Sequence, residues 1–166
     1  MAKPGQIDWD ALVGPAANAR RHLPPLVGAY FAEGRALLAE AGEPATLHRL
    51  RLLSKRLRYT LELFRPIYGP GLEERLEALK RVQEMLGETN DAVISARLIE
   101  YLPRSVRMKR HLADLAAASA DAFRAQWRDH FDAPGREQWW TGYLATGTRG
   151  EAAQVRRAGT GSGTAA

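Results

Sequence analysis

The sequence contains no cysteine in its 166 residues. This absence excludes disulfides, cysteine-ligated zinc and thiol nucleophiles. The sequence also has no apolar run close to the roughly 18 residues that a membrane-spanning helix needs. Its first residues lack the charged and apolar segments of a signal peptide. We therefore expect a cytoplasmic protein with no membrane partner.

Strand patterns are missing as well, because no stretch alternates apolar and polar residues convincingly. Apolar residues instead recur at helical spacing between proline and glycine positions. This pattern predicts an all-α fold, a helical bundle of four to five helices. We expect the bundle over residues 16–145, a flexible leader over 1–15 and a disordered tail over 146–166.

Proline and glycine positions divide the predicted helices. Pro24 and Pro25 are expected to interrupt the first helical stretch, because proline lacks an N–H donor and clashes with the preceding turn. The later helices are predicted at about 25–41, 46–65, 71–86, 89–103 and 104–131.

Four polar or small residues have predicted local roles in these helices. Thr46 is the expected N-cap of the helix over 46–65, and Gly87 the expected left-handed cap that ends the helix over 71–86. Thr89 or Asn90 is expected to cap the helix that follows. Gln83 falls in the apolar stripe of its helix, which predicts a buried hydrogen bond between helices.

Acidic residues are scarce in one helix, since Glu62 is the only one between Ala45 and Arg65. A helical wheel separates this helix into two faces. The apolar face is Leu50, Leu53, Leu57, Leu61 and Phe64. The opposite face is His48, Arg51, Lys55, Arg58 and Tyr59, with Arg49 and Arg56 on its flank.

This basic face has two interpretations. Like charges at i, i+3 and i+4 repel by a few tenths of a kcal/mol per pair, and an ordinary exposed surface relieves this with interspersed acids. The face is therefore either a basic surface that holds nothing or a binding site for a polyanion, which guanidinium groups grip through paired charge-assisted hydrogen bonds. His48 would either contact the anion or bond a backbone carbonyl at the helix start. A formal net charge of +5 favours an anionic partner without identifying it.

The stretch "LHRLRLLSKRLRYTLELF" resembles the signature of the CHAD family, the conserved histidine α-helical domains. The matching positions are His48, Arg51, Lys55, Arg56, Arg58 and Tyr59. A second stretch, "LKRVQEMLGETNDAVIS", resembles the family's second signature, with Gln83, Leu86, Gly87, Asn90 and Asp91 in register. Together with "AFRAQWRDHF", these motifs extend the resemblance over roughly residues 20–140.

The resemblance implies a helical bundle that binds inorganic polyphosphate without processing it, in some members on polyphosphate granules. It implies no cofactor. Carried over to this sequence, the polyphosphate contacts are His48, Arg51, Lys55, Arg56 and Arg58. Tyr59 is expected to contact the ligand or to support the basic face, and Lys80 is a further candidate contact.

The family usually carries the first motif once in each of two halves, whereas this sequence has it once, in a form that resembles the second half. A homodimer would restore two halves around a two-fold axis, and a monomer with a weaker half-site is the alternative.

Other functions are less well supported by the sequence. The four histidines, His22, His48, His111 and His130, do not fall at i, i+4 on one helix, so we expect no metal site. An enzyme acting on phosphoanhydrides is not expected, because no carboxylate cluster is visible that would hold magnesium. A general nucleic-acid-binding protein is the main alternative, since any basic face attracts phosphates.

Overall fold

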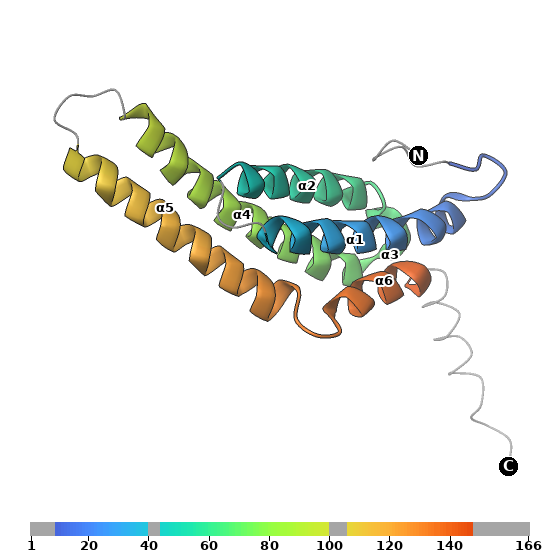
Figure 1. Ribbon diagram of the computed structural model, residues 1–166. Helices are drawn as coiled ribbons and strands as arrows, with labels where there is room; N and C mark the ends of the chain where they lie inside the picture. Colours follow the sequence, from blue (N-terminus) through green and yellow to red (C-terminus); the bar gives the residue numbers. More distant parts are fainter. Residues whose placement is uncertain (1–8, 40–43, 100–105, 148–166) are drawn as a thin grey trace, which may run out of the picture.

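The computed structural model describes residues 9–39, 44–99 and 106–147, and within these residues the chain is a bundle of helices without strands (Figure 1). The elements are α1 (Pro15–Ala39), α2 (Pro44–Glu62), α3 (Arg65–Tyr68), α4 (Pro70–Leu98), α5 (Val106–Gln126), the π-helical segment η1 (Trp127–Phe131) and α6 (Arg136–Thr146). The predicted all-α bundle is confirmed. The described residues form six α-helices, one more than the upper prediction, and α3 is a single turn.

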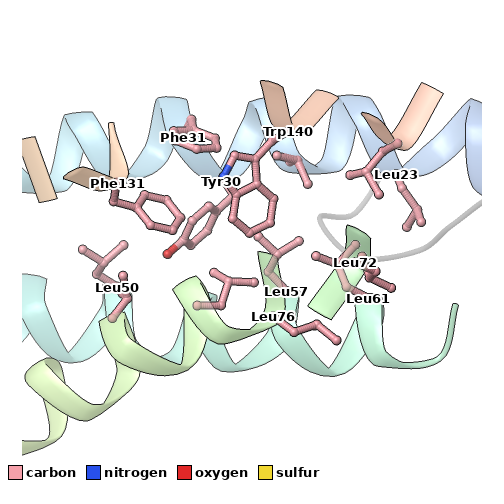
Figure 2. Close-up of a cluster of buried hydrophobic side chains, with 14 of the residues drawn as sticks. Leu23, Tyr30, Phe31, Leu50, Leu57, Leu61, Leu72, Leu76, Phe131 and Trp140 are labelled. Atoms are coloured by element: carbon pink, nitrogen blue, oxygen red, sulfur yellow. The ribbon is translucent and has the colours of Figure 1, made fainter. Parts of the chain in front are cut away.

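Two helices hold the bundle together. α1 packs on α2 and α6, and α4 packs on α2 and α5. Figure 2 shows aromatic and leucine side chains meeting between these helices. The fully buried large apolar side chains are Leu23, Val27 and Phe31 from α1, Leu50 and Leu61 from α2, Leu72, Leu79 and Leu86 from α4, Phe123 from α5, and Trp140 and Leu144 from α6.

α1 approaches its neighbours closely at two points. The hydroxyl groups of Tyr30 and Ser54 lie 2.7 Å apart, which ties α1 to α2 inside the core, and burial raises the pKa of Tyr30. Gly34 lies against the indole of Trp127, because a Cβ at this position would be 2.5 Å from Cζ2 of that ring. A side chain here would push η1 away from α1.

α6 is attached to α4 by a buried arginine. The Arg75 guanidinium carbon lies 3.5 Å from the ring centroid of Trp139 and 3.9 Å from that of Tyr143. Its terminal nitrogens donate to the carbonyls of Gly71, at 2.8 Å, and Trp139, at 2.6 Å. Burial lowers the pKa of Arg75 to about 10, so the side chain remains cationic at neutral pH.

The predicted interruption at Pro24 and Pro25 is wrong, because both prolines lie inside the continuous helix α1. Pro24 is half-buried and Pro25 exposed, while Leu23 and Val27 on the opposite side are fully buried. Packing of that apolar side on α2 and α6 holds the helix together despite two missing N–H donors.

The predicted N-cap at Thr46 is also wrong. α2 begins at Pro44, which places Thr46 within the first turn of the helix. Proline is favoured in the first turn of a helix because the missing N–H has no partner there and φ is already helical. The predicted end near Arg65 is close, since α2 ends at Glu62.

The predicted break at Gly87 is absent, and α4 continues from Pro70 to Leu98 as one helix. Gly87 is not among the described glycines with positive φ, which are Gly69 and Gly135. Thr89 and Asn90 are therefore not N-caps. Thr89 is buried and its hydroxyl lies 2.8 Å from that of Ser119 on α5, so packing on α5 continues across the predicted break.

Two turns between helices are formed at glycines with positive φ. Gly69 adopts φ 77° between α3 and α4, and Gly135 adopts φ 81° just before α6. The predicted leader and tail boundaries stay predictions, because residues 1–8 and 148–166 lie outside the described residues. The predicted helix ends near Ala41 and Pro103 lie outside them too.

Candidate functional site

Four of the predicted site residues lie in one line along α2. His48, Arg51, Lys55 and Arg58 recur at spacings of three and four, which places them on a single stripe of the helix. We call these four residues the basic stripe. The apolar face of α2 is confirmed as predicted, with Leu50, Leu57, Leu61 and Phe64 buried and Leu53 half-buried. α2 is thus fixed in rotation by its leucines.

The basic stripe borders α4. The His48 ring nitrogen Nδ1 lies 3.4 Å from the amide oxygen of Asn90. Arg58 Nε donates to the amide oxygen of Gln83 at 3.2 Å. From His48 to Arg58 the residue number rises along α2, while that of the α4 partner falls from Asn90 to Gln83. The two helices are therefore antiparallel, and the basic stripe lies along the seam between them.

Two cations of the basic stripe have no acidic partner. Within residues 9–39, 44–99 and 106–147, neither Arg51 nor Lys55 forms an ion pair. Both side chains are half-buried beside α4. By contrast, Arg49 on the flank of α2 pairs with Glu33 of α1 at 2.6 Å. The two uncompensated charges therefore lie at the centre of the stripe.

Arg58 is the most constrained member of the basic stripe. Its guanidinium donates to the carboxylate of Glu62 at 2.5 Å and lies 4.5 Å from the ring centroid of Tyr59. With the bond to Gln83, these contacts fix the side chain at the end of the stripe. Tyr59, which is 51% exposed, thus supports Arg58 and remains accessible from solvent.

The other predicted contacts lie off the stripe. Arg56 is exposed on the adjacent side of α2. Lys80 of α4 lies between two carboxylates, 4.0 Å from Glu77 and 3.8 Å from Glu84, and is exposed. Arg56 is therefore not on the basic stripe, and the charge of Lys80 is partly compensated.

Two amide side chains complete the seam. The predicted interhelical hydrogen bond of Gln83 is confirmed, because its Nε2 donates to the carbonyl of Ser54 at 3.1 Å. The same side chain accepts from Arg58, which the sequence reasoning missed. The contact of Asn90 with His48 was missed as well, because the predicted helix break made Asn90 a cap. Asn90 follows Gln83 by seven residues, or about two helical turns, and this spacing in the sequence indicated that both side chains lie on the face of α4 toward α2.

Gly87 lies beside the basic stripe. The antiparallel register that joins His48 to Asn90 places Gly87 next to Arg51, one turn along. A Cβ at Gly87 would meet nothing within 4 Å. The seam is therefore open at Arg51, because α4 offers no side chain there.

Within the described part of the chain, no three histidine or acidic residues gather as metal ligands would. Among the same residues, no helix has the length and apolar character of a membrane span.

Comparisons with known proteins give one match. A family model described as the CHAD domain matches residues 5–100, which is more than half of the chain. The matched region contains all of α2 and α4, and therefore the whole basic stripe with its amide partners. No curated protein and no solved structure matches.

Proposed function

The chain belongs to the CHAD domain family, and we propose on this basis that its basic stripe binds inorganic polyphosphate without catalysing a reaction on it. The observation that carries the proposal is the pair Arg51 and Lys55, two half-buried cations without an acidic partner among the described residues. Family membership supports polyphosphate as the anion, because the CHAD domain is a polyphosphate-binding family.

The shape of the site suits a linear anion. His48 and Arg58 are ten residues apart, which at 1.5 Å per residue corresponds to about 15 Å along α2. Successive phosphoryl groups would meet the four side chains in turn. Arg51 would offer a planar fork to the phosphate oxygens and Lys55 a compact charge. The neutral or protonated imidazole of His48 would donate at one end, and Arg58 at the other.

Binding should weaken steeply with salt. If the four members of the basic stripe each neutralise one phosphate charge, the logarithm of the association constant should fall with a slope of about −3 against the logarithm of the salt concentration. Raising the salt from about 50 to 200 mM would then weaken binding about 60-fold. Calorimetric titration with long-chain polyphosphate measures this slope. A slope near zero would contradict binding through these cations.

The same titration separates the polyphosphate proposal from its main alternative. Duplex DNA added at equal phosphate concentration should displace little polyphosphate, because a rigid double helix does not fit into a seam beside a single helix. Full displacement would instead favour a general nucleic-acid-binding protein. Release of orthophosphate from purified polyphosphate would overturn the non-enzymatic proposal.

Gly87 provides a second test of the site. Glycine within a helix costs about 0.5–1 kcal/mol relative to alanine, so Gly87→Ala should raise the free energy of unfolding by about that amount. Gly87→Leu should weaken polyphosphate binding about tenfold, because its side chain would fill the seam beside Arg51. Thermal unfolding and the calorimetric titration measure the two effects.

Gly142 on α6 is the matched control for Gly87, since a Cβ there also meets nothing within 4 Å. Gly142→Leu should leave binding unchanged. Equal binding by Gly87→Leu and Gly142→Leu would show that the ligand does not use the seam.

The predicted homodimer, the predicted association with polyphosphate granules and the predicted cytoplasmic location stay predictions.

A further inference from the structure

A continuous row of four aromatic side chains lies where α5 passes into η1 and the chain turns into α6. The ring centroid of Trp127 is 6.2 Å from that of Phe123 and 4.6 Å from that of Phe131. The centroid of Phe131 is in turn 5.6 Å from that of Trp140. The four residues are buried and together line a pocket of about 410 Å³. This volume is in the range of small-molecule sites, roughly 300–1,000 Å³.

α4 provides a second apolar wall of this pocket. Ala78, Val82 and Met85 line it at spacings of four and three, which places them on one side of the helix. Gln83 and Asn90 contact the basic stripe from another side of α4. At 100° per residue, these two amides lie about 80–160° around the helix from the apolar wall. The pocket and the basic stripe are therefore on different sides of α4.

The π-helical segment η1 contributes Trp127, His130 and Phe131 to the pocket. Its wide turn is closed by the backbone N–H of Asp132, which donates to the carbonyl of Trp127 at 2.7 Å. π-helical turns are rare, and they occur frequently at functional sites. The departure from α-helical geometry thus coincides with the pocket.

Basic side chains from three elements line the same pocket. They are Arg81 from α4, His130 from η1 and Arg136 from α6, and none of them forms an ion pair with another described residue. Among the described residues that line the pocket, Glu74 is the only acid. It precedes Arg81 by seven residues, or about 10 Å along α4. The lining is therefore net positive, which favours an anionic group on the molecule that binds.

We propose that this pocket binds a small aromatic acid, a flat apolar molecule that carries one anionic group. Its rings would pack on the aromatic row, since aromatic pairs gain more than burial of their area alone. Its anionic group would lie beside Arg81, whose guanidinium presents paired donors to an anion. The proposal does not depend on polyphosphate binding, because the basic stripe lies on a different side of α4.

Two matched fluorescent probes test the proposal on the full chain. The first, 8-anilinonaphthalene-1-sulfonate, is an aromatic molecule with one anionic group, and N-phenyl-1-naphthylamine is the same molecule without the sulfonate. The sulfonate probe should bind with one-to-one stoichiometry and a dissociation constant of about 10–100 μM. It should bind about tenfold more tightly than the neutral probe. Equal affinities of the two probes, or no saturable binding of either, would overturn the proposal.

Arg81→Glu should remove the preference for the sulfonate probe and leave binding of the neutral probe unchanged. Arg81 is exposed and forms no ion pair among the described residues, so the substitution breaks none. Arg110→Glu is the matched control, because Arg110 is equally exposed and without such a pair but lies on α5 outside the pocket. The control should keep the preference. Equal losses in the two variants would show that net charge alone attracts the sulfonate.

Filling the pocket gives an independent readout. Ala78→Phe should weaken binding of both probes at least about tenfold, because its ring would occupy the space between α4 and the aromatic row. Ala116→Phe is the control, since Ala116 is half-buried like Ala78 but lines a separate groove between α4 and α5. It should bind both probes like the wild type, and circular dichroism should show equal helix content in both variants. Loss of binding in Ala116→Phe alone would place the probes in the other groove and contradict the proposal.

Polyphosphate distinguishes this pocket from the basic stripe. Long-chain polyphosphate should not displace the sulfonate probe from the wild-type protein. A variant in which Arg51 and Lys55 are replaced by glutamate should bind the probe like the wild type. Displacement by polyphosphate, or loss of probe binding in this variant, would place the probe on the basic stripe and overturn the proposal.

Discussion

Replacing Arg51 and Lys55 together by glutamate should weaken polyphosphate binding at least about 100-fold. A hydrogen bond to a charged group contributes roughly 1.5–3 kcal/mol, so the loss of two such contacts removes about 3 kcal/mol or more. The new carboxylates would also repel the phosphates. Because neither native side chain has an acidic partner among the described residues, the substitutions break no ion pair of the fold. Calorimetry with long-chain polyphosphate measures the loss.

The matched control for this variant is Arg21→Glu combined with Arg128→Glu. Both arginines are exposed and lie outside α2, and each double variant lowers the formal net charge from +5 to +1. The control should bind within about threefold of the wild type at physiological salt, because exposed charges farther than about 8 Å from the ligand are largely screened. Equal losses in both variants would mean that net charge alone attracts the anion.

Arg58 should behave differently from the two central cations. Its guanidinium already contacts Glu62, Gln83 and Tyr59. Its removal would both weaken binding and disturb the contact between α2 and α4. Arg51 and Lys55 are therefore the residues whose substitution separates binding from folding.

Arg75→Ala should lower the free energy of unfolding by about 3–4 kcal/mol, the second large effect that we expect. The substitution removes two charge-assisted hydrogen bonds to backbone carbonyls and a desolvated cation–π contact that contributes about 2 kcal/mol, and the free energy recovered by no longer burying the guanidinium offsets part of this loss. It also leaves a cavity between Trp139 and Tyr143, the two rings that enclose the guanidinium. Chemical unfolding followed by circular dichroism measures the change.

Arg75→Met separates packing from charge at this position. Methionine fills much of the same space, and replacing a buried charge by an apolar side chain of similar volume is often far less costly than truncation. We therefore expect a loss of only about 1–2 kcal/mol. Arg81→Ala on the same helix is the control, because Arg81 is exposed and should change stability by less than about 0.5 kcal/mol. If Arg75→Ala also changed the free energy of unfolding by less than about 0.5 kcal/mol, the proposed anchoring of α6 by Arg75 would be contradicted.

The candidate site was largely predictable because it lies on one helix. The order of residues along α2 fixes which side chains share a stripe, so the leucine face and the opposite stripe of His48, Arg51, Lys55 and Arg58 follow from a period of 3.6 residues. The leucines are buried as expected. The scarcity of acidic residues near Arg51 and Lys55 was also visible in the sequence of this one helix. In agreement, neither Arg51 nor Lys55 forms an ion pair among the described residues.

Predictions that rested on proline and glycine failed where neighbouring helices provided packing. Pro24 and Pro25 lie within α1, and Gly87 lies within α4. Glycine or proline inside a helix costs about 1–3 kcal/mol per residue relative to alanine. Burial of several large apolar side chains along one helix contributes more than that, so tertiary contacts decided whether each helix continued.

The sequence by itself determined that this protein is helical, which face of α2 is apolar, and where positive charge gathers without acids. These properties depend on residues within one or two turns of each other. Only the tertiary structure decided that Asn90 and Gln83 meet the basic stripe, that Lys80 lies between two acids, and that four aromatic side chains line a pocket beside α4. Those properties depend on the rotation and relative length of helices far apart in the chain, which packing sets and local sequence does not.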